Sequence, residues 1–455
     1  MPWSCADPYP PFADPGPAKR SRFRDHPEPT VVDVPRLAAG HRGRAIGAAG
    51  CAASVHAMAS TPGVPRPVRV RMQARAVDEE HRVSTPLELL FDLTFVVAVS
   101  RTAAELGNGI VSGDAGHSLV VYLMVFFGIW WSWMNFSWFA SAYDTDDVPY
   151  RLLTLLQMAG VLVYAAGVHE TFKSGSFAAA TVGYVIMRVA MLLQWVRAAH
   201  GDPEHAHAAW RYVVGVGTMQ VLWVLRLLLP PDLGFAAFFV LAAGELAVPL
   251  WAERVRMTPW HPHHIAERYG LFTIIVLGEC VLAASVAVQV VVDDTGWEPR
   301  LLLVGGGGLV LLFALWWLYF LKEAGDGLER RRDLSFLWGY GHYAVFAGLA
   351  ALGAGLEVTV EAVSHHVSVS DGGVALSVAG PVAVFLAVVW LLHAPLDEGY
   401  RAGALPVGLA VIAVLAISLL GALGLPLQWV PLLCAVPPAA LVTTRLRAAP
   451  AQPEG

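Results

Sequence analysis

Residues 85–99 read TPLELLFDLTFVVAV, a run in which two acids stand among almost wholly apolar neighbours. Glu88 and Asp92 are four residues apart, and this spacing puts both carboxylates on one face of a helix. A charged side chain inside a hydrocarbon layer is costly and needs a partner. The stretch therefore predicts a membrane-spanning helix whose two acids have a structural or functional use.

The composition of the whole chain is that of a membrane protein. Of its 455 residues, 56% are hydrophobic and 15% are charged, whereas soluble domains carry about 25% charged residues. Apolar blocks of about 18 to 23 residues recur, which is the length that crosses a hydrocarbon core of about 30 Å. The net charge of −6 shows no basic face, which argues against nucleic acid as a partner. The predicted partner is the lipid bilayer of the cell membrane.

The predicted fold class is an all-α membrane protein with about twelve transmembrane helices. The segments are 86–107, 118–140, 151–170, 176–197, 210–229, 233–252, 268–290, 300–321, 335–356, 373–393, 403–422 and 426–446. Residues 1–82 are rich in Pro and Arg without a hydrophobic period, which predicts a disordered cytoplasmic tail. Met58 and Met72 are alternative start positions that would make part of this tail a start-site artefact. Residues 448–455 form a short C-terminal tail.

The distribution of arginine predicts that both termini are cytoplasmic. Arginines gather before the first helix and in the loops at 254–268 and 322–333, which all fall on one side of a twelve-helix chain. The loops on the other side, such as 357–373, are dominated by acids. This asymmetry satisfies the positive-inside rule.

Two stretches indicate an internal repeat. ELLFDLTFVVAV from residue 88 aligns with ERYGLFTIIVLG from residue 267, and FGIWWSW from 127 aligns with FALWWLY from 313. The predicted units are residues 83–255 and 256–447, and six helices in each would give both the same orientation. Parallel duplications of this kind are frequent in transporters, whose binding site lies between the halves.

The first acid of each repeat is predicted to lie at a helix entry. Thr85 followed by Pro86 and Glu88 forms a capping box, in which the threonine caps the helix and the glutamate reaches back to it. Glu267 and Arg268 occupy the matching position in the second half. This interpretation makes Thr85, Glu88, Glu267 and Arg268 structural residues of the helix entries.

The second acid, Asp92, is too deep to cap the helix. It stands about 10 Å along the helix at 1.5 Å per residue, and an intramembrane acid is a functional hypothesis with a partner to be found. Arg188 is predicted at a similar depth in an antiparallel helix. The pair either locks two helices together or takes part in transport or catalysis.

Further polar residues fall within predicted membrane segments at comparable levels. They are Glu245 in LAAGELAVPLW, Glu279 in TIIVLGECVLAA and His342 in WGYGHYAVF. Together with Asp92 and Arg188 they would form a polar interior through which protons or ions could pass. Each of them alone could also be a satisfied core group.

Tryptophans form a second set of candidates. Trp130 and Trp131 lie near the middle of their helix, and Trp316 and Trp317 match them in the second half. They either anchor and pack the helices or line a cavity.

No metal site or cofactor is predicted. The histidines of HPHHIAE at 261–267 match no helix-based zinc motif, because Pro262 interrupts their spacing. The GGGG run at 305–308 lies inside an apolar helix and is no phosphate-binding loop.

Several blocks resemble one bacterial membrane-protein family. TPLELLFDLTFVVAVSR, YVIMRVAMLLQWVRAA, HIAERYGLFTIIVLGE, ALWWLYF and GHYAVFAGLAALGAGLE resemble the low temperature requirement A family over residues 82 to 360. The resemblance implies a multi-pass membrane protein and implies no particular chemistry. Its specific blocks carry Glu88, Asp92, Arg188, Glu267, Arg268, Gly278 and Glu279. The long Pro- and Arg-rich tail departs from the short start usual in the family.

Three functions are compatible with these patterns. A transporter or an ion- or proton-coupled permease is favoured, because it accounts for both the duplicated bundle and the buried acids. A non-catalytic structural or sensory protein would use the charges only to specify helix packing. An intramembrane enzyme acting on lipid could use the buried acids and His342 as acid and base, but the sequence shows no recognisable nucleophile or phosphate-binding constellation. Substrate, coupling ion and oligomeric state are not specified by the sequence.

Overall fold

The computed structural model describes residues 68–75, 79, 82–296, 298–365 and 367–448, and every regular element within them is a helix. The predicted tails therefore lie largely outside the described residues. The first half of the described chain contains α1 (Pro86–Val111), α2 (Ala115–Tyr143), α3 (Val148–Ser174), α4 (Ala178–Gly201), α5 (Ala206–Arg226) and α6 (Pro231–Ala252). The second contains α7 (Pro262–Thr295), α8 (Pro299–Phe320), α9 (Gly325–Arg330), α10 (Ser335–Ser364), α11 (Asp371–His393), α12 (Glu398–Arg401), α13 (Ala404–Ala422) and α14 (Val430–Ala448).

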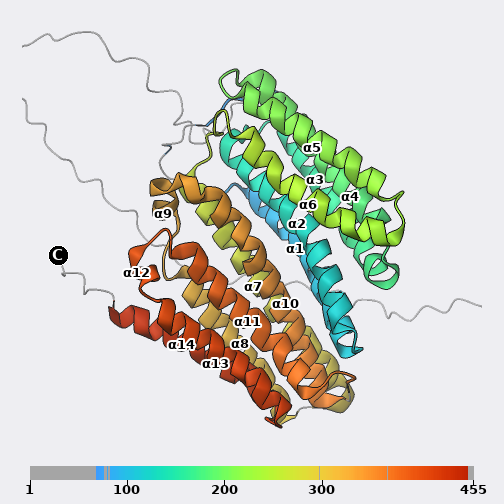
Figure 1. Cartoon of the computed structure of the whole chain (residues 1–455), viewed down its shortest axis with the longest axis vertical. Coiled ribbons are helices and arrows are strands. Elements are labelled where there is room, and N and C mark those ends of the chain that lie inside the picture. Colours follow the sequence, from blue (N-terminus) through green and yellow to red (C-terminus); the bar gives the residue numbers. More distant parts are fainter. Residues whose placement is uncertain (1–67, 76–78, 80–81, 297, 366, 449–455) are drawn as a thin grey trace, which may run out of the picture. The chain divides into compact units, whose positions relative to one another are not determined.

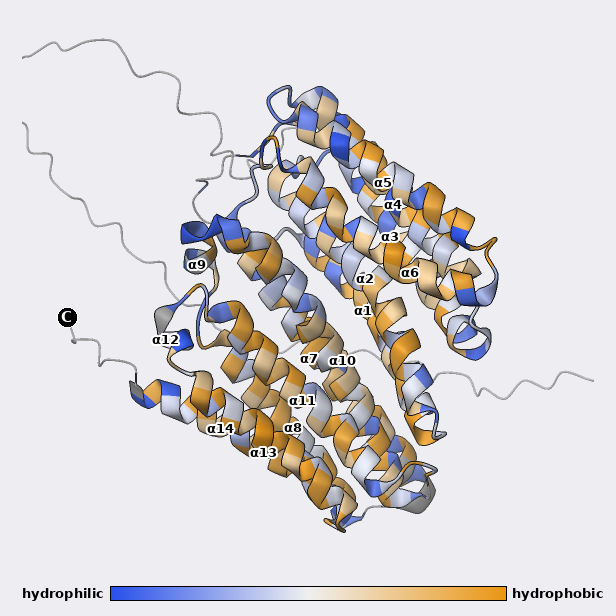
Figure 2. Ribbon diagram, viewed as in Figure 1, coloured by the Kyte–Doolittle hydropathy of each residue, from blue (hydrophilic) through white to orange (hydrophobic). Residues whose placement is uncertain are grey.

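Each of the twelve predicted segments corresponds to one long helix, and α9 and α12 are short connecting turns. Ten of the described helices are long and apolar enough to cross a membrane, and α1 and α5 are the long helices outside this set. Hydrophobic residues run along the helices and hydrophilic ones gather at their ends (Figure 2). The chain is a multi-pass helical membrane protein.

The predicted capping box at the start of α1 is confirmed. The backbone N–H of Glu88 donates to Thr85 Oγ1 at 3.3 Å, and the backbone N–H of Thr85 donates to Glu88 Oε2 at 2.8 Å. The matching prediction for α7 is wrong. That helix begins at Pro262 with His261 as its cap, so Glu267 and Arg268 lie inside the helix and not at its entry.

Several neighbour relations recur in the two halves, although α8 packs closely on α14 and α2 does not pack as closely on α6. In the first half, α1 packs on α2 and α3, and α3, α4, α5 and α6 follow one another as neighbours. In the second half, α7 packs on α8 and α10, and α10, α11, α13 and α14 follow in the same way. The halves meet where α1 and α2 contact α7 and α10, as the blue-to-green and yellow-to-red helices show (Figure 1).

Residues 68–75, which the sequence assigns to the tail, contact the helical bundle. Met72 is buried, and Arg71 Nε donates to the carbonyl of Gly201 at 2.8 Å. The backbone N–H of Val70 donates to Asp147 Oδ2 at 2.9 Å. This short segment is therefore anchored at the ends of α3 and α4, and the disorder predicted for the tail does not extend to it.

Glycines allow α3 and α4 to approach closely. A Cβ atom on Gly183 would collide with the backbone nitrogen of Tyr164 and the carbonyl oxygen of Gly160. Small residues at such positions let membrane helices pack backbone to backbone. The Gly160–Gly183 contact thus sets how closely α3 and α4 pack.

We expect Gly183→Ala to destabilise the protein, because the added methyl group meets backbone atoms that cannot rotate away. Overpacking of this kind costs about 1 to 3 kcal/mol. Gly217→Ala on α5 is the matched control, since its Cβ would be 4.0 Å from its nearest neighbour, Leu192 Cδ2. Thermal unfolding in detergent measures both, and an equal Tm for the two variants would contradict the close α3–α4 contact.

Candidate functional site

A buried ion network joins the two halves of the chain. Arg268 on α7 lies between the two acids of α1, with Nη1 3.1 Å from Glu88 Oε1 and Nη2 2.5 Å from Asp92 Oδ1. All three side chains are fully buried. The four-residue spacing of the acids lets one guanidinium contact both carboxylates, because they lie on one helix face. The network therefore fixes α1 against α7.

Neighbouring donors extend this network, although Asp92 Oδ2 and Arg268 Nε lack a hydrogen-bond partner among the described residues. Trp133 Nε1 on α2 donates to Asp92 Oδ1 at 2.7 Å, and Arg268 Nη2 donates to Ser137 Oγ at 3.3 Å. His264 Nε2 lies 3.3 Å from Glu88 Oε1. Buried charges persist when they are paired and hydrogen-bonded, and both carboxylates here meet that condition. Glu88 thus serves the helix cap and the ion network together.

The predicted pair of Asp92 with Arg188 is wrong. Arg188 donates to the hydroxyl of Tyr184 at 2.7 Å and lies 3.8 Å from Glu245 Oε2. The prediction paired Asp92 with Arg188 because both were expected at a similar depth in the membrane. A similar depth does not show that two helices are neighbours. The α4 helix packs on α3 and α5, and Asp92 has Arg268 as its partner.

Glu245 on α6 is held in a closed cage within the first half. It lies within ion-pair distance of Arg188 and accepts four hydrogen bonds, from Trp131 Nε1 (2.9 Å), Tyr184 OH (2.9 Å), Gln220 Nε2 (3.3 Å) and Trp223 Nε1 (3.1 Å). These donors come from α2, α4 and α5. The cage therefore binds four helices together around one carboxylate.

Glu279 lies in a different environment, a cavity between α1, α7 and α10. The cavity has a volume of about 180 Å³, and its lining contains Glu279 and Glu357 with small residues such as Ser100, Ala103 and Gly353. Among the described residues, neither carboxylate has a hydrogen-bond or ion-pair partner. Glu279 and Glu357 thus line one cavity at the contact between the two halves.

Sequence reasoning missed Glu357. The predicted helix ended at residue 356, but α10 continues to Ser364 and carries Glu357 on a buried turn. The signal was present in LEVTVEAV, where apolar residues still surround the acid. A loop assignment based on the acids alone placed it outside the membrane.

His342 is a satisfied core residue of the second half. Its Nδ1 lies 2.8 Å from the carbonyl of Trp338 and its Nε2 lies 3.0 Å from the hydroxyl of Tyr319. A neutral ring that donates from Nδ1 and accepts at Nε2 satisfies both contacts. The five predicted polar residues thus occupy four separate places and do not converge on one interior site.

The four candidate tryptophans have different surroundings. Trp131 lines a cavity of about 30 Å³, while Trp130 is buried against Tyr340 and Tyr343. Trp316 and Trp317 are 45% and 51% exposed on α8. The second pair therefore faces outward, where the bilayer would cover it.

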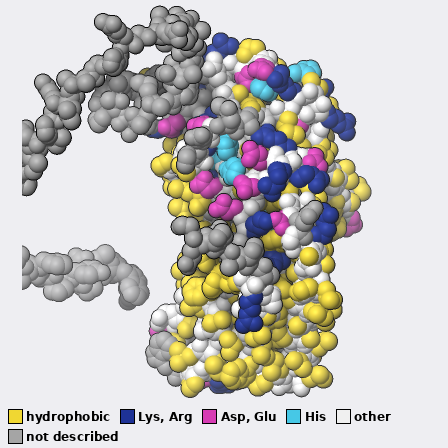
Figure 3. All heavy atoms as spheres, turned by 90° about the vertical axis from the view of Figure 1, so that its left-hand side faces the viewer, with side chains coloured by type: hydrophobic (Ala, Val, Ile, Leu, Met, Phe, Trp, Pro, Cys, Tyr) yellow, Lys and Arg dark blue, Asp and Glu magenta, His cyan; other side chains and the backbone are white. Residues whose placement is uncertain are grey.

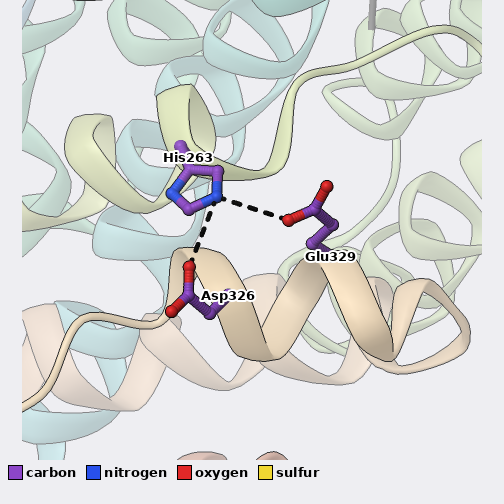
Figure 4. Close-up of side chains that lie close together, drawn as sticks. All are labelled: His263, Asp326 and Glu329. Atoms are coloured by element: carbon purple, nitrogen blue, oxygen red, sulfur yellow. Dashed lines mark ion pairs between the residues drawn. The ribbon is translucent and has the colours of Figure 1, made fainter. Parts of the chain in front are cut away.

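One group of side chains has the spacing of metal ligands. His263 Nε2 lies 3.5 Å from Asp326 Oδ1 and 3.6 Å from Glu329 Oε2, and the three side chains point toward one another (Figure 4). Two ligands at about 2.1 Å from a tetrahedral ion are separated by about 3.4 Å. The set could hold one divalent ion, but its members are exposed, and an ion pair accounts for the same contacts.

Comparison with known proteins places the chain in a family. The model of the Bacterial low temperature requirement A protein (LtrA) family matches residues 83–444. The chain belongs to this family. The match begins at residue 83, just before α1, and ends at residue 444 within α14, so it includes at least part of every long helix.

A curated relative of this low temperature requirement A protein is an uncharacterized protein of Rhizobium meliloti (strain 1021). The two are 26% identical over 330 residues, which covers 69% of this chain and 78% of the relative. No solved structure matches the chain. The comparisons establish the family and leave the activity to be argued from the geometry.

Double-mutant cycles can distinguish the observed ion pair from the predicted one. We expect Asp92→Asn and Arg268→Gln to be coupled by about 1 to 3 kcal/mol, because each removes the partner of the other. The cycle of Asp92→Asn with Arg188→Gln is the control and should be additive within about 0.5 kcal/mol. Unfolding in mixed detergent micelles measures both. A larger coupling in the second cycle would contradict the Arg268 network.

Proposed function

We propose that this membrane protein is a transporter or permease coupled to protons or small cations, located in the cell membrane. The observation that carries the proposal is the cavity between α1, α7 and α10, which is lined by Glu279 and Glu357. An acid at membrane depth is costly unless a proton or a cation neutralises it. Two such acids in one cavity would take up a proton or cation and release it again.

The arrangement of the helices supports the same proposal. Because α1–α6 and α7–α14 repeat one order of neighbours, we infer a parallel duplication with six transmembrane helices in each half. In this interpretation α1 and α5 also cross the bilayer, and both termini are cytoplasmic as the arginine distribution predicts. Transporters with duplicated bundles bind their substrates between the halves, and the Glu279–Glu357 cavity lies at that contact.

The acids divide into two classes that suit different roles. Glu88, Asp92 and Glu245 are enclosed by donors and cations, so a change of their charge would cost a whole network of contacts. Within the described part of the chain, Glu279 and Glu357 lack such partners, and both line the cavity. The first class would hold the helices in place, and the second would exchange protons or ions.

A structural or sensory role is the second candidate. The enclosed networks around Arg268 and Glu245 favour it, since buried ion pairs of this kind specify which helices pack together. This role leaves the Glu279–Glu357 cavity without a use. Flux measurements therefore separate the two functions.

We expect ion flux to depend on both cavity acids. In proteoliposomes containing the full chain, Glu279→Gln and Glu357→Gln should each slow proton or cation flux by about tenfold, which corresponds to about 1.4 kcal/mol in the barrier. The amide keeps the shape of the side chain and removes its charge. Flux would be driven in turn by a pH step, a Na⁺ gradient and a K⁺ gradient.

The matched control is Glu361→Gln, because Glu361 is exposed one turn beyond Glu357 on the same helix. Its flux should stay within about twofold of the wild type, a difference of less than 0.5 kcal/mol. Flux in the double variant Glu279→Gln/Glu357→Gln equal to that of the wild type would reject ion coupling through this cavity.

A further inference from the structure

A second cavity lies at the end of the bundle where α7 begins and α8 ends. Its volume is about 360 Å³, within the usual range for small-molecule pockets. The lining combines residues of α7 with the loop after α8, Trp338 of α10 and His393 of α11. Neither the ion networks nor the Glu279–Glu357 cavity accounts for this space.

Two buried donors in its lining have no partner. The side chain of Arg82 is 2% exposed, and its Nη2 donates to the carbonyl of Ala140 at 2.7 Å, while Nε and Nη1 have no hydrogen-bond partner among the described residues. The indole N–H of Trp338, which is also 2% exposed, is likewise unpartnered. Buried donors are almost always hydrogen-bonded in proteins, so this end of the cavity is built to receive an acceptor.

The guanidinium of Arg82 makes an anion the matching ligand. Burial and the nearby Arg75 lower the pKa of Arg82, while Glu88 and Asp144 act in the opposite direction. Glu88, at 4.0 Å from Arg82, is shared with Arg268, and Asp144 lies 3.6 Å from Arg75. An arginine with two free N–H groups suits a phosphate or a carboxylate. The positive charge of Arg82 is therefore incompletely compensated.

The other charged residues of the lining do not change the preference of the cavity for an anion. Lys322 forms an ion pair with Asp397, and Glu267 Oε1 accepts from the backbone N–H of Ser84 at 3.2 Å. Glu323 is exposed. Of the donors in the lining, Arg82 Nε and Nη1 and the indole N–H of Trp338 are the buried ones without a partner among the described residues.

The cavity also has an apolar side. Gly270, Leu271, Ile274 and Phe320 belong to its lining, and Ile274 and Phe320 are 46% and 36% exposed. One face of the molecule shows charged side chains gathered in its upper part and hydrophobic ones below (Figure 3). A ligand that combines a charged head with a hydrocarbon chain matches this boundary.

We propose that this cavity binds the phosphate-bearing head of an anionic lipid, with Arg82 and Trp338 donating to the phosphate and the acyl chain lying along Ile274 and Phe320. This site is independent of the proposed transport function. On α7, Glu267 at the polar end of its lining precedes Glu279 by twelve residues, about 18 Å, and Ile274 at its apolar end precedes Glu279 by five residues, about 7.5 Å. A lipid bound there would bridge α7, α10 and the segment before α1.

The experiment is native mass spectrometry of the full chain in detergent, titrated with phosphatidylglycerol and, separately, with phosphatidylcholine of the same acyl chains. We expect phosphatidylglycerol to bind about tenfold more tightly. Arg82→Gln should weaken it by about tenfold and Trp338→Phe by about threefold. The phenyl ring of the second variant keeps the packing on Tyr269 and His342, so the proposal stays testable if Arg82→Gln fails to fold.

Matched controls come from the same end of the bundle. Arg331 is exposed and paired with Asp333, and Trp317 is exposed on α8, and neither lines the cavity. Arg331→Gln and Trp317→Phe should bind the lipid like the wild type. Equal binding of the two lipids, or unchanged binding in Trp338→Phe, would overturn the proposal. Competition by soluble glycerol 3-phosphate at the lipid's concentration would also overturn it, because a free phosphate would then be the ligand.

Discussion

The contact of Arg268 with Glu88 and Asp92 constrains the rest of the structure. It joins α7 to α1 across the two halves, and Trp133 adds α2 to the same network. Removing one member of a buried charge network leaves the others uncompensated, at a cost of about 3 to 5 kcal/mol. The relative position of these helices is therefore set by charge, whereas apolar side chains alone would let them slide. The cage around Glu245 plays the same part within the first half.

The sequence predicted the helices well and their lateral partners poorly. All twelve segments and the capping box of Thr85 follow from local patterns, since hydrophobic length and cap residues act within a few positions. The partner of Asp92 depends on which helices are neighbours, and depth alone cannot supply that. The predicted start of α7 also hid the partner of Asp92. Starting α7 at residue 268 and not at Pro262 placed Arg268 at the surface, about 9 Å short of its place in the helix.

The predicted repeat also misled the interpretation of single side chains. Trp131 and Trp317 align in sequence, yet Trp131 donates to Glu245 while Trp317 is half exposed. The reason lies in the neighbours of each helix. The α8 helix packs extensively on α14, whereas α2 turns the face that carries Trp131 toward the Glu245 cage. The alignment of the two stretches therefore predicts the order of the helices better than the environment of a single side chain, since Trp131 contacts a buried carboxylate and Trp317 lies half exposed.

In the proposed transport function, α7 carries both a fixed point and an exchangeable charge. Arg268 is clamped by the acids of α1, and Glu279 stands eleven residues further along the same helix, about 17 Å away. Sliding α7 past α1 would expose three buried charges, so the Glu279–Glu357 cavity cannot open in that way at low cost. Movement of α10, which contributes no described residue to this network, would open the cavity with the network intact. The ion network would then hold α7 against α1 while the Glu279–Glu357 cavity opens and closes.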